Sequence, residues 1–181
     1  MHNNWRSLVS NNRLVAALVA GFVATHMATV TGYWYRMIGF APDANGQGFV
    51  TLDWPAFNGL LIRPQATLFS WEQFVAGAVF HTFTGICFSL IFAFLIHPML
   101  PWKNTTLGNI GKALVWGEFL ALVSALWWVP SLFPAFNPGF LSLNLGWKTT
   151  VGIFIWHAVY GIHLGAFYNP LPDGQPAEKR M

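Results

Sequence analysis

Charged side chains are scarce in this sequence of 181 residues. Asp, Glu, Lys and Arg together make up 8% of the chain, whereas roughly a quarter of the residues in a soluble domain are charged. Hydrophobic residues make up 55%, which leaves too little polar surface for a protein that must stay dissolved in water. The composition therefore excludes an ordinary soluble domain and predicts an all-α integral membrane protein.

Several chemical motifs are also missing. A single cysteine, Cys87, excludes a disulfide within the chain. The sequence contains no HExxH, no CxxC, no glycine-rich phosphate loop and no Ser-His-Asp set, so no motif identifies a metal or a nucleophile. We therefore expect no catalytic activity from this chain alone. Its Lys and Arg residues form no basic cluster, which argues against a nucleic-acid partner.

Long apolar segments dominate what is present. A transmembrane helix needs about 20 mostly apolar residues. The segments that meet this requirement are 14–38, 74–96, 110–129 and 150–167. They predict four transmembrane helices in a single membrane domain over 1–181, with a long outer loop at 40–70 and a polar C-terminal tail at 170–181.

One spaced pattern occurs twice. The stretches WEQFVAGAVFHTFTGI (71–86) and WKTTVGIFIWHAVYGI (147–162) both read W-x3-V-x5-H-x3-G-I. Two shorter blocks, A-L-V-x-G and P-A-F-N, precede both copies in the same order. This order predicts tandem repeats at 13–99 and 109–169, each a helical hairpin. Because each repeat crosses the membrane twice, the two share one orientation, as parallel repeats do. We expect their apolar outer loops to lie at the membrane interface and to contain short helices.

The repeat places two histidines, His81 and His157, at equivalent positions. Each follows a Trp by ten residues, which is roughly 15 Å along a helix. Gly85 and Gly161 follow four residues later on the same helix face, where they would leave room for a large ring. Such a pair of imidazoles can hold haem b or a pigment. The same residues also suit interhelical hydrogen bonds and close packing, so the occupant stays open among haem b, a pigment, a quinone and a bound lipid.

Three further ionisable residues lie within the predicted helices. Glu118 is deep in the third, where a carboxylate costs at least about 2.5 kcal/mol on insertion scales, so we expect it to face the bundle interior and to be protonated, paired or functional. His26 and His163 lie at neighbouring depths, and a Glu–His pair would stabilise both groups and relay protons. We expect His97, beside Pro98 at a helix end, to be solvated.

Three functions fit these features. An accessory subunit of a membrane-embedded redox complex, respiratory or photosynthetic, suits a small apolar chain that packs beside larger integral-membrane subunits and membrane lipids. A stand-alone b-type haem electron carrier needs His81 and His157 to converge. A small proton or ion transporter needs a polar path through Glu118. The accessory subunit is the function that we expect.

The positions of Lys and Arg predict the orientation. Three basic residues lie on the side of the outer loops: Arg36, Arg63 and Lys148. Six basic residues lie on the other side: Arg6, Arg13, Lys103, Lys112, Lys179 and Arg180. Because positive charges concentrate on the cytoplasmic side, both termini should be cytoplasmic. We expect the chain in a bacterial inner membrane.

Cysteine labelling tests this orientation. In a background where Cys87 is replaced by Ser, a membrane-impermeant thiol reagent added to intact spheroplasts should label Asn137→Cys in the outer P-A-F-N loop. It should leave Gln175→Cys in the C-terminal tail unlabelled until the membrane is opened. Strong external labelling at position 175 would contradict the predicted orientation.

Overall fold

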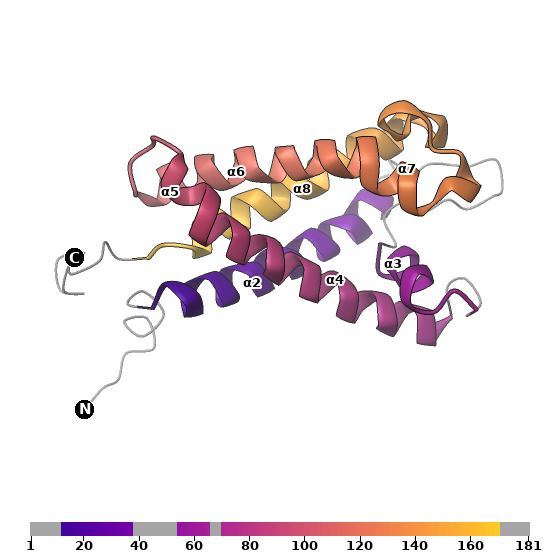
Figure 1. The fold of residues 1–181 in the computed structure, drawn as a ribbon, viewed down its shortest axis with the longest axis horizontal. Coiled ribbons are helices and arrows are strands. Elements are labelled where there is room, and N and C mark those ends of the chain that lie inside the picture. The colour runs from indigo at the N-terminus through magenta and orange to yellow at the C-terminus, as the bar shows by residue number, and fades with distance from the viewer. Residues whose placement is uncertain (1–11, 38–53, 66–69, 171–181) are drawn as a thin grey trace.

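The computed structural model describes residues 12–37, 54–65 and 70–170, and these residues form helices and turns without any strand (Figure 1). Four helices in this part are long and apolar enough to cross a membrane, which confirms the four predicted spans. They are α2 (Arg13–Met37), α4 (Trp71–Ile91), α6 (Thr106–Val123) and α8 (Trp147–Phe167). Their number and composition indicate an integral membrane protein.

Shorter elements extend or connect these helices. Helix α4 continues through a π turn, η1 (Phe92–Ile96), into α5 (His97–Met99), and α6 continues through η2 (Ser124–Trp128) into α7 (Val129–Leu132). The first P-A-F-N block lies inside the short helix α3 (Trp54–Ile62). The second begins in η3 (Pro134–Phe136), which η4 (Phe140–Leu145) follows. Residues 40–53 and 66–69 of the expected 40–70 loop and nearly all of the 170–181 tail lie outside the described residues.

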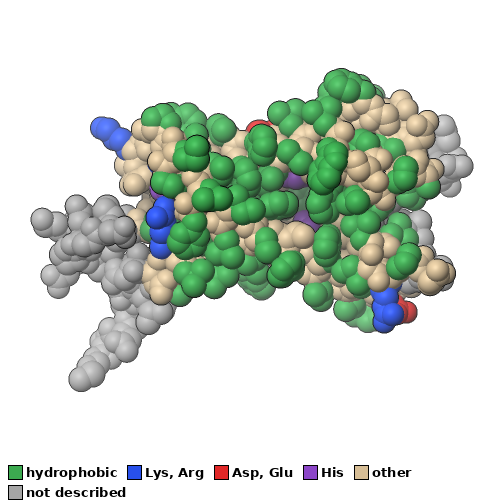
Figure 2. Space-filling model, viewed as in Figure 1, with side chains coloured by type: hydrophobic (Ala, Val, Ile, Leu, Met, Phe, Trp, Pro, Cys, Tyr) green, Lys and Arg blue, Asp and Glu red, His purple; other side chains and the backbone are tan. Residues whose placement is uncertain are grey.

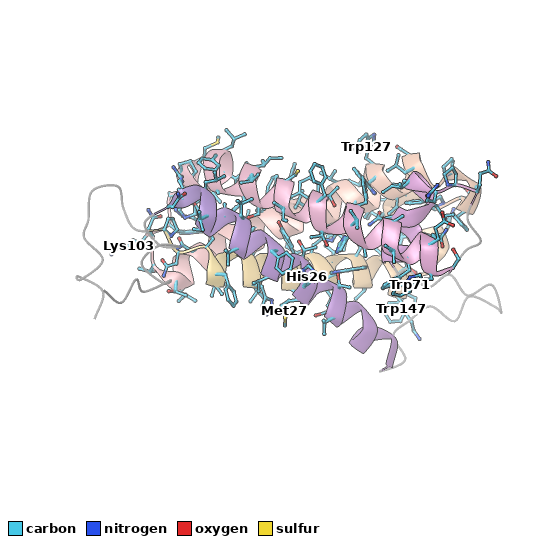
Figure 3. All side chains as sticks on the ribbon, turned by 90° about the horizontal axis from the view of Figure 1, so that it is seen from below. His26, Met27, Trp71, Lys103, Trp127 and Trp147 are labelled. Carbon is cyan, nitrogen blue, oxygen red and sulfur yellow. The ribbon has the colours of Figure 1, made fainter. Side chains whose placement is uncertain are left out.

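The long helices run antiparallel between two ends of the molecule. Lys103, in the turn between α5 and α6, lies at one end, and Trp71 and Trp147 lie at the other (Figure 3). Both Trp side chains are exposed, at 76% and 60%. Indole rings favour the membrane–water interface, so this end fits the predicted outer surface.

Two prolines explain the π turns. Pro98 and Pro130 each come two residues after a π turn ends. The His97 N–H donates to the Phe92 carbonyl, and the Val129 N–H donates to the Ser124 carbonyl, each five residues back. Proline has no N–H and would clash with the carbonyl four residues earlier in a regular helix. The wider turn accommodates this ring, so both helices continue past the proline.

Glycines let α6 and α8 approach closely. A Cβ atom added at Gly161 would lie 2.5 Å from the Ala113 carbonyl oxygen. One added at Gly165 would meet the Ile110 backbone, and one added at Gly117 would meet the His157 carbonyl. Small residues at such spacings are a common basis of helix association in membranes. This contact fixes the second hairpin.

Helix α2 lies between α4 and α8 and offers both a face of small side chains. Among residues 13–31, the part of α2 whose side chains are described, the buried hydrophobic residues are all alanines: Ala16, Ala17, Ala20, Ala24 and Ala28. On the α4 side, the Ser89 hydroxyl donates to the Ala17 carbonyl at 2.6 Å. Because the buried side chains of α2 are small, the backbones of α4 and α8 can both come close to this helix.

The two hairpins differ in register. Gly117 packs against Gly161 in the second hairpin. In the first, the counterpart of Gly117 is Gly21, which packs against Ser89. The counterpart of Gly161 is Gly85, four residues before Ser89 and about one helical turn away. The helices of the two hairpins therefore meet at different heights, and the tandem-repeat organisation stays a prediction from the sequence.

A buried polar network joins the helices at the end that carries Lys103. The Arg13 guanidinium donates to the Tyr168 hydroxyl at 3.0 Å and to the Ala93 carbonyl at 2.8 Å. The His97 Nε2 atom lies 2.9 Å from Asn109 Oδ1, and Asn109 Nδ2 donates to the Tyr168 carbonyl at 3.1 Å. The expectation that His97 is solvated was wrong, because only 3% of this residue is exposed. The network ties together the helix ends at this surface.

Replacing Gly165 by Ala should destabilise the fold. The added Cβ would press on the backbone of Ile110, and overpacking of this kind costs about 1–3 kcal/mol. The matched control is Gly111→Ala on α6, where the nearest side-chain atom is 3.7 Å from the added Cβ. Thermal unfolding in one detergent should show a lower midpoint for Gly165→Ala than for Gly111→Ala. Equal midpoints would contradict the proposed contact.

Candidate functional site

A cavity of about 100 Å³ lies in the middle of the bundle, between α4 and α6. All four long helices line it, and α3 adds Asn58. Figure 2 shows a hollow near the centre of this face, with histidine surface visible inside it and hydrophobic side chains around it. His81 and His157 both line the cavity. The structure thus brings the two repeated histidines to one place.

Two aromatic pairs connect α4 with the helix formed by α6 and η2, and they frame the opening. Phe80 and Trp128 stack with ring centroids 6.4 Å apart on the side of the outer loops. Phe88 and Trp116 meet edge to face at 6.5 Å on the opposite side. Between Phe80 and Phe88, α4 advances by roughly 12 Å. We call the opening between these pairs the window.

Helices α2 and α8 form the back of the cavity. The Tyr160 hydroxyl donates to the Gly85 carbonyl at 2.7 Å, which ties α8 to α4 across the cavity. The Thr25 hydroxyl donates to the Gly21 carbonyl of its own helix at 2.7 Å. These polar hydrogens are therefore engaged inside the protein.

His157 has hydrogen-bond partners at both ring nitrogens. Its Nδ1 atom lies 2.8 Å from the Ile153 carbonyl oxygen, and because a carbonyl only accepts, Nδ1 must carry the proton. The Nε2 atom of this neutral tautomer then accepts from the Ser124 hydroxyl at 3.3 Å. The ring is held in a defined orientation, and any ligand at Nε2 would displace Ser124.

His81 is placed differently. Its ring lies near the Thr25 backbone and 5.7 Å from the Trp156 ring, measured between centroids. Its Nε2 atom is buried and has no hydrogen-bond partner among the described residues. A buried polar atom without a partner costs about 1–3 kcal/mol. A ligand that pairs with Nε2 inside the cavity would recover this energy.

The two predicted glycine sites are filled by neighbouring helices. A Cβ at Gly85 would collide with the Thr25 side chain, and a Cβ at Gly161 would collide with the backbone of Ala113 and Leu114. Gly85 borders the cavity, whereas Gly161 faces α6. Their missing side chains therefore serve close helix packing. Cofactor binding by these glycines stays a prediction.

The other predicted ionisable residues lie apart from the cavity. Exposed His26 lies in the middle part of α2, with Nδ1 2.7 Å from the Phe22 carbonyl (Figure 3). The Nδ1 atom of His163 lies 2.8 Å from the Val159 carbonyl. Glu118 is half-buried beside the exposed residues Val115 and Phe119, so the expectation that it faces the bundle interior is not met. It forms no hydrogen bond or ion pair with the described residues. The expected Glu–His pair is therefore not formed in this part of the chain.

Most residues that line the cavity were not predicted from the sequence, and Ser124 and Trp128 are two of them. Both belong to the π turn before Pro130, and both line the cavity. The signal in the sequence was a lone hydroxyl six residues before a proline within an apolar segment. Within the described residues, no group of three His, Cys, Asp or Glu side chains gathers to hold a metal ion.

Comparisons with known proteins assign neither a family nor a function to this chain. No protein-family model matches the chain, and neither the search of curated proteins nor the search of solved structures found a significant match. The function is therefore argued from the geometry above.

Proposed function

We propose that this chain is an accessory subunit of a membrane-embedded redox complex, respiratory or photosynthetic, and that it packs against a larger subunit through the outer face of α6. The observation that carries the proposal is the position of Glu118. This carboxyl group lies near the middle of a predicted span, without a partner among the described residues.

The surroundings of Glu118 form an apolar stripe on α6. Val115, Phe119 and Leu122 lie three, one and four residues away from it, and all three are exposed. A carboxyl group that faces lipid costs at least about 2.5 kcal/mol at this depth. A neighbouring transmembrane helix with a hydrogen-bond donor would remove part of this cost, because such bonds stabilise helix pairs by about 1–2 kcal/mol. The apolar stripe would supply the packing surface for that helix.

The outer end offers further apolar surface. Phe140 and Leu143 in η4 are exposed, and Trp147 at the start of α8 is exposed as well. Leu141 and Ser142 have positive φ angles of 51° and 58°, so this segment holds an unusual backbone conformation. A partner that covers this end would shield the apolar side chains.

The cavity supports a redox complex over an ion transporter. Two imidazoles line one space at membrane depth, and imidazole binds or hydrogen-bonds many redox cofactors. A transporter needs a continuous chain of polar groups. In the described part of the chain, the imidazoles of His26 and His163 hydrogen-bond to carbonyls of their own helices, and Glu118 contacts neither.

Substituting Glu118 by Leu should release the partner. If the carboxyl group pairs with a donor on a neighbouring helix, loss of about 1–2 kcal/mol would lower co-purification by roughly 5- to 30-fold. The measurement is the share of tagged chain that migrates with a large complex on a native gel after mild solubilisation of its native membrane. Glu118→Gln keeps a carbonyl oxygen that can accept the same hydrogen bond and should retain more of the partner.

Phe22→Leu is the matched control, because Phe22 occupies the equivalent position in the first repeat and is exposed on α2. It should leave the complex intact. A wild-type chain that migrates alone, as the Glu118→Leu variant does, would contradict the proposed function.

A stand-alone haem carrier is the second candidate, because His81 and His157 line the same cavity. We expect the purified chain to show no haem absorption: the cavity holds about 100 Å³, and Ser124 already occupies His157 Nε2. Absorption spectra of the oxidised and dithionite-reduced protein measure this. A bis-imidazole haem spectrum that disappears in both His81→Ala and His157→Ala would replace the proposed function by electron carriage.

A further inference from the structure

We propose that the cavity binds the head ring of a lipid-soluble quinone, which enters from the bilayer through the window and hydrogen-bonds to His81. This inference names a ligand for the redox complex of the proposed function and rests on it for its biological setting. The site itself is argued from this chain alone.

The window opens toward the hydrocarbon of the membrane. On α4, the exposed residues Val79 and Phe83 alternate with the lining residues Phe80 and Thr84. On α6, Phe119 and Leu122 are exposed beside the lining residue Leu120, and Figure 2 shows hydrophobic surface around the hollow. A molecule that reaches the cavity by this route must therefore be lipid-soluble.

The cavity has aromatic walls and holds about 100 Å³, which is less than the 150 Å³ of an engineered apolar cavity that binds benzene. Because the cavity is open at the window, a substituted ring would fill it and extend into the window. Aromatic side chains from α4, η2 and α8 line it: Phe80, Phe88, Trp128 and Trp156. The two aromatic pairs limit its length, so the ring would lie in the cavity and the window while an isoprenoid tail remains in the bilayer.

His81 supplies the polar contact. The hydroxyl groups around the cavity are engaged: Ser124 bonds to His157, Tyr160 to the Gly85 carbonyl, and Thr84 to carbonyls of its own helix. His81 Nε2 is buried and has no hydrogen-bond partner among the described residues, and the His81 ring lines the cavity.

The chemistry of an imidazole nitrogen selects among lipophilic occupants. In the tautomer with the proton on Nε2, the ring donates to a quinone carbonyl oxygen. In the other tautomer, Nε2 accepts from a quinol hydroxyl. A lipid acyl chain would fill the same volume and leave Nε2 unpaired, so a ring with an oxygen substituent is favoured.

Binding can be measured on the full-length chain in lipid nanodiscs. The probe is a ubiquinone analogue with a ten-carbon tail, and the readout is quenching of Trp fluorescence, since Trp128 and Trp156 border the cavity. Quenching should saturate with probe concentration. Decylbenzene, which has the same tail and a ring without oxygen, should compete about tenfold less well, as expected for the loss of one hydrogen bond.

His81→Phe keeps a ring of similar size and removes the nitrogen, so it should lower quinone affinity about tenfold. The matched control is His163→Phe on α8, because His163 does not line the cavity. Thr84→Phe, which fills the cavity from α4, should abolish saturable quenching. Thermal unfolding of each variant shows whether a loss of binding reflects a loss of folding. The comparison of quinone with decylbenzene uses the wild-type chain, so it tests the site even if a variant does not fold.

Non-saturable quenching, or equal affinity for quinone and decylbenzene, would overturn the quinone site. The test is independent of the proposed complex. If quinone fails to bind while Glu118→Leu still releases a partner, the quinone site is wrong and the proposed function is unaffected. If quinone binds but the wild-type chain and Glu118→Leu migrate alike on the native gel, the proposed function is wrong and the quinone site is unaffected.

Discussion

The close contact between α6 and α8 determines how the rest of the bundle is arranged. Gly117, Gly161 and Gly165 bring the two backbones together, so one face of α8 is occupied by α6 and another receives α2. Helix α4 then packs on α2 and on the short helix α3. As a result, α4 faces α6 mainly through the two aromatic pairs, and the space between these pairs is the cavity. The site is thus a consequence of packing elsewhere.

A membrane interior makes each unpaired polar group costly, because no water is present to hydrogen-bond it. The network around Arg13, His97 and Asn109 meets this requirement with side-chain and carbonyl partners. In the middle of the bundle, His81 Nε2 and the Glu118 carboxyl group lack partners among the described residues. Both proposals therefore concern groups that the isolated fold leaves unsatisfied, one inside the cavity and one on the outer face of α6.

Hydropathy alone located the four spans within a few residues, because helix formation in a membrane depends on local apolar length. The spaced repeat also singled out His81 and His157, which line one cavity. Features that depend on contacts between segments were not predictable. The burial of His97 requires Asn109 from another helix. The lack of a Glu118–histidine pair depends on how each helix is rotated about its axis, and hydropathy does not specify that rotation.

The same repeat explains why the two histidines differ. Aligning A-L-V-x-G in both halves places Ser124 opposite Ala28, and both residues line the cavity. His157 has a hydroxyl partner within its own half, whereas the equivalent position of the first half is an alanine, which has no hydroxyl to offer His81. The helices of the two hairpins also pack four residues out of register with each other, so the His81 and His157 rings have different neighbours. One histidine is thus fixed by internal hydrogen bonds at both ring nitrogens, and the other has a buried Nε2 atom without a partner among the described residues. A histidine that served packing alone would need a hydrogen-bond partner at each ring nitrogen, and the described residues supply none at His81 Nε2.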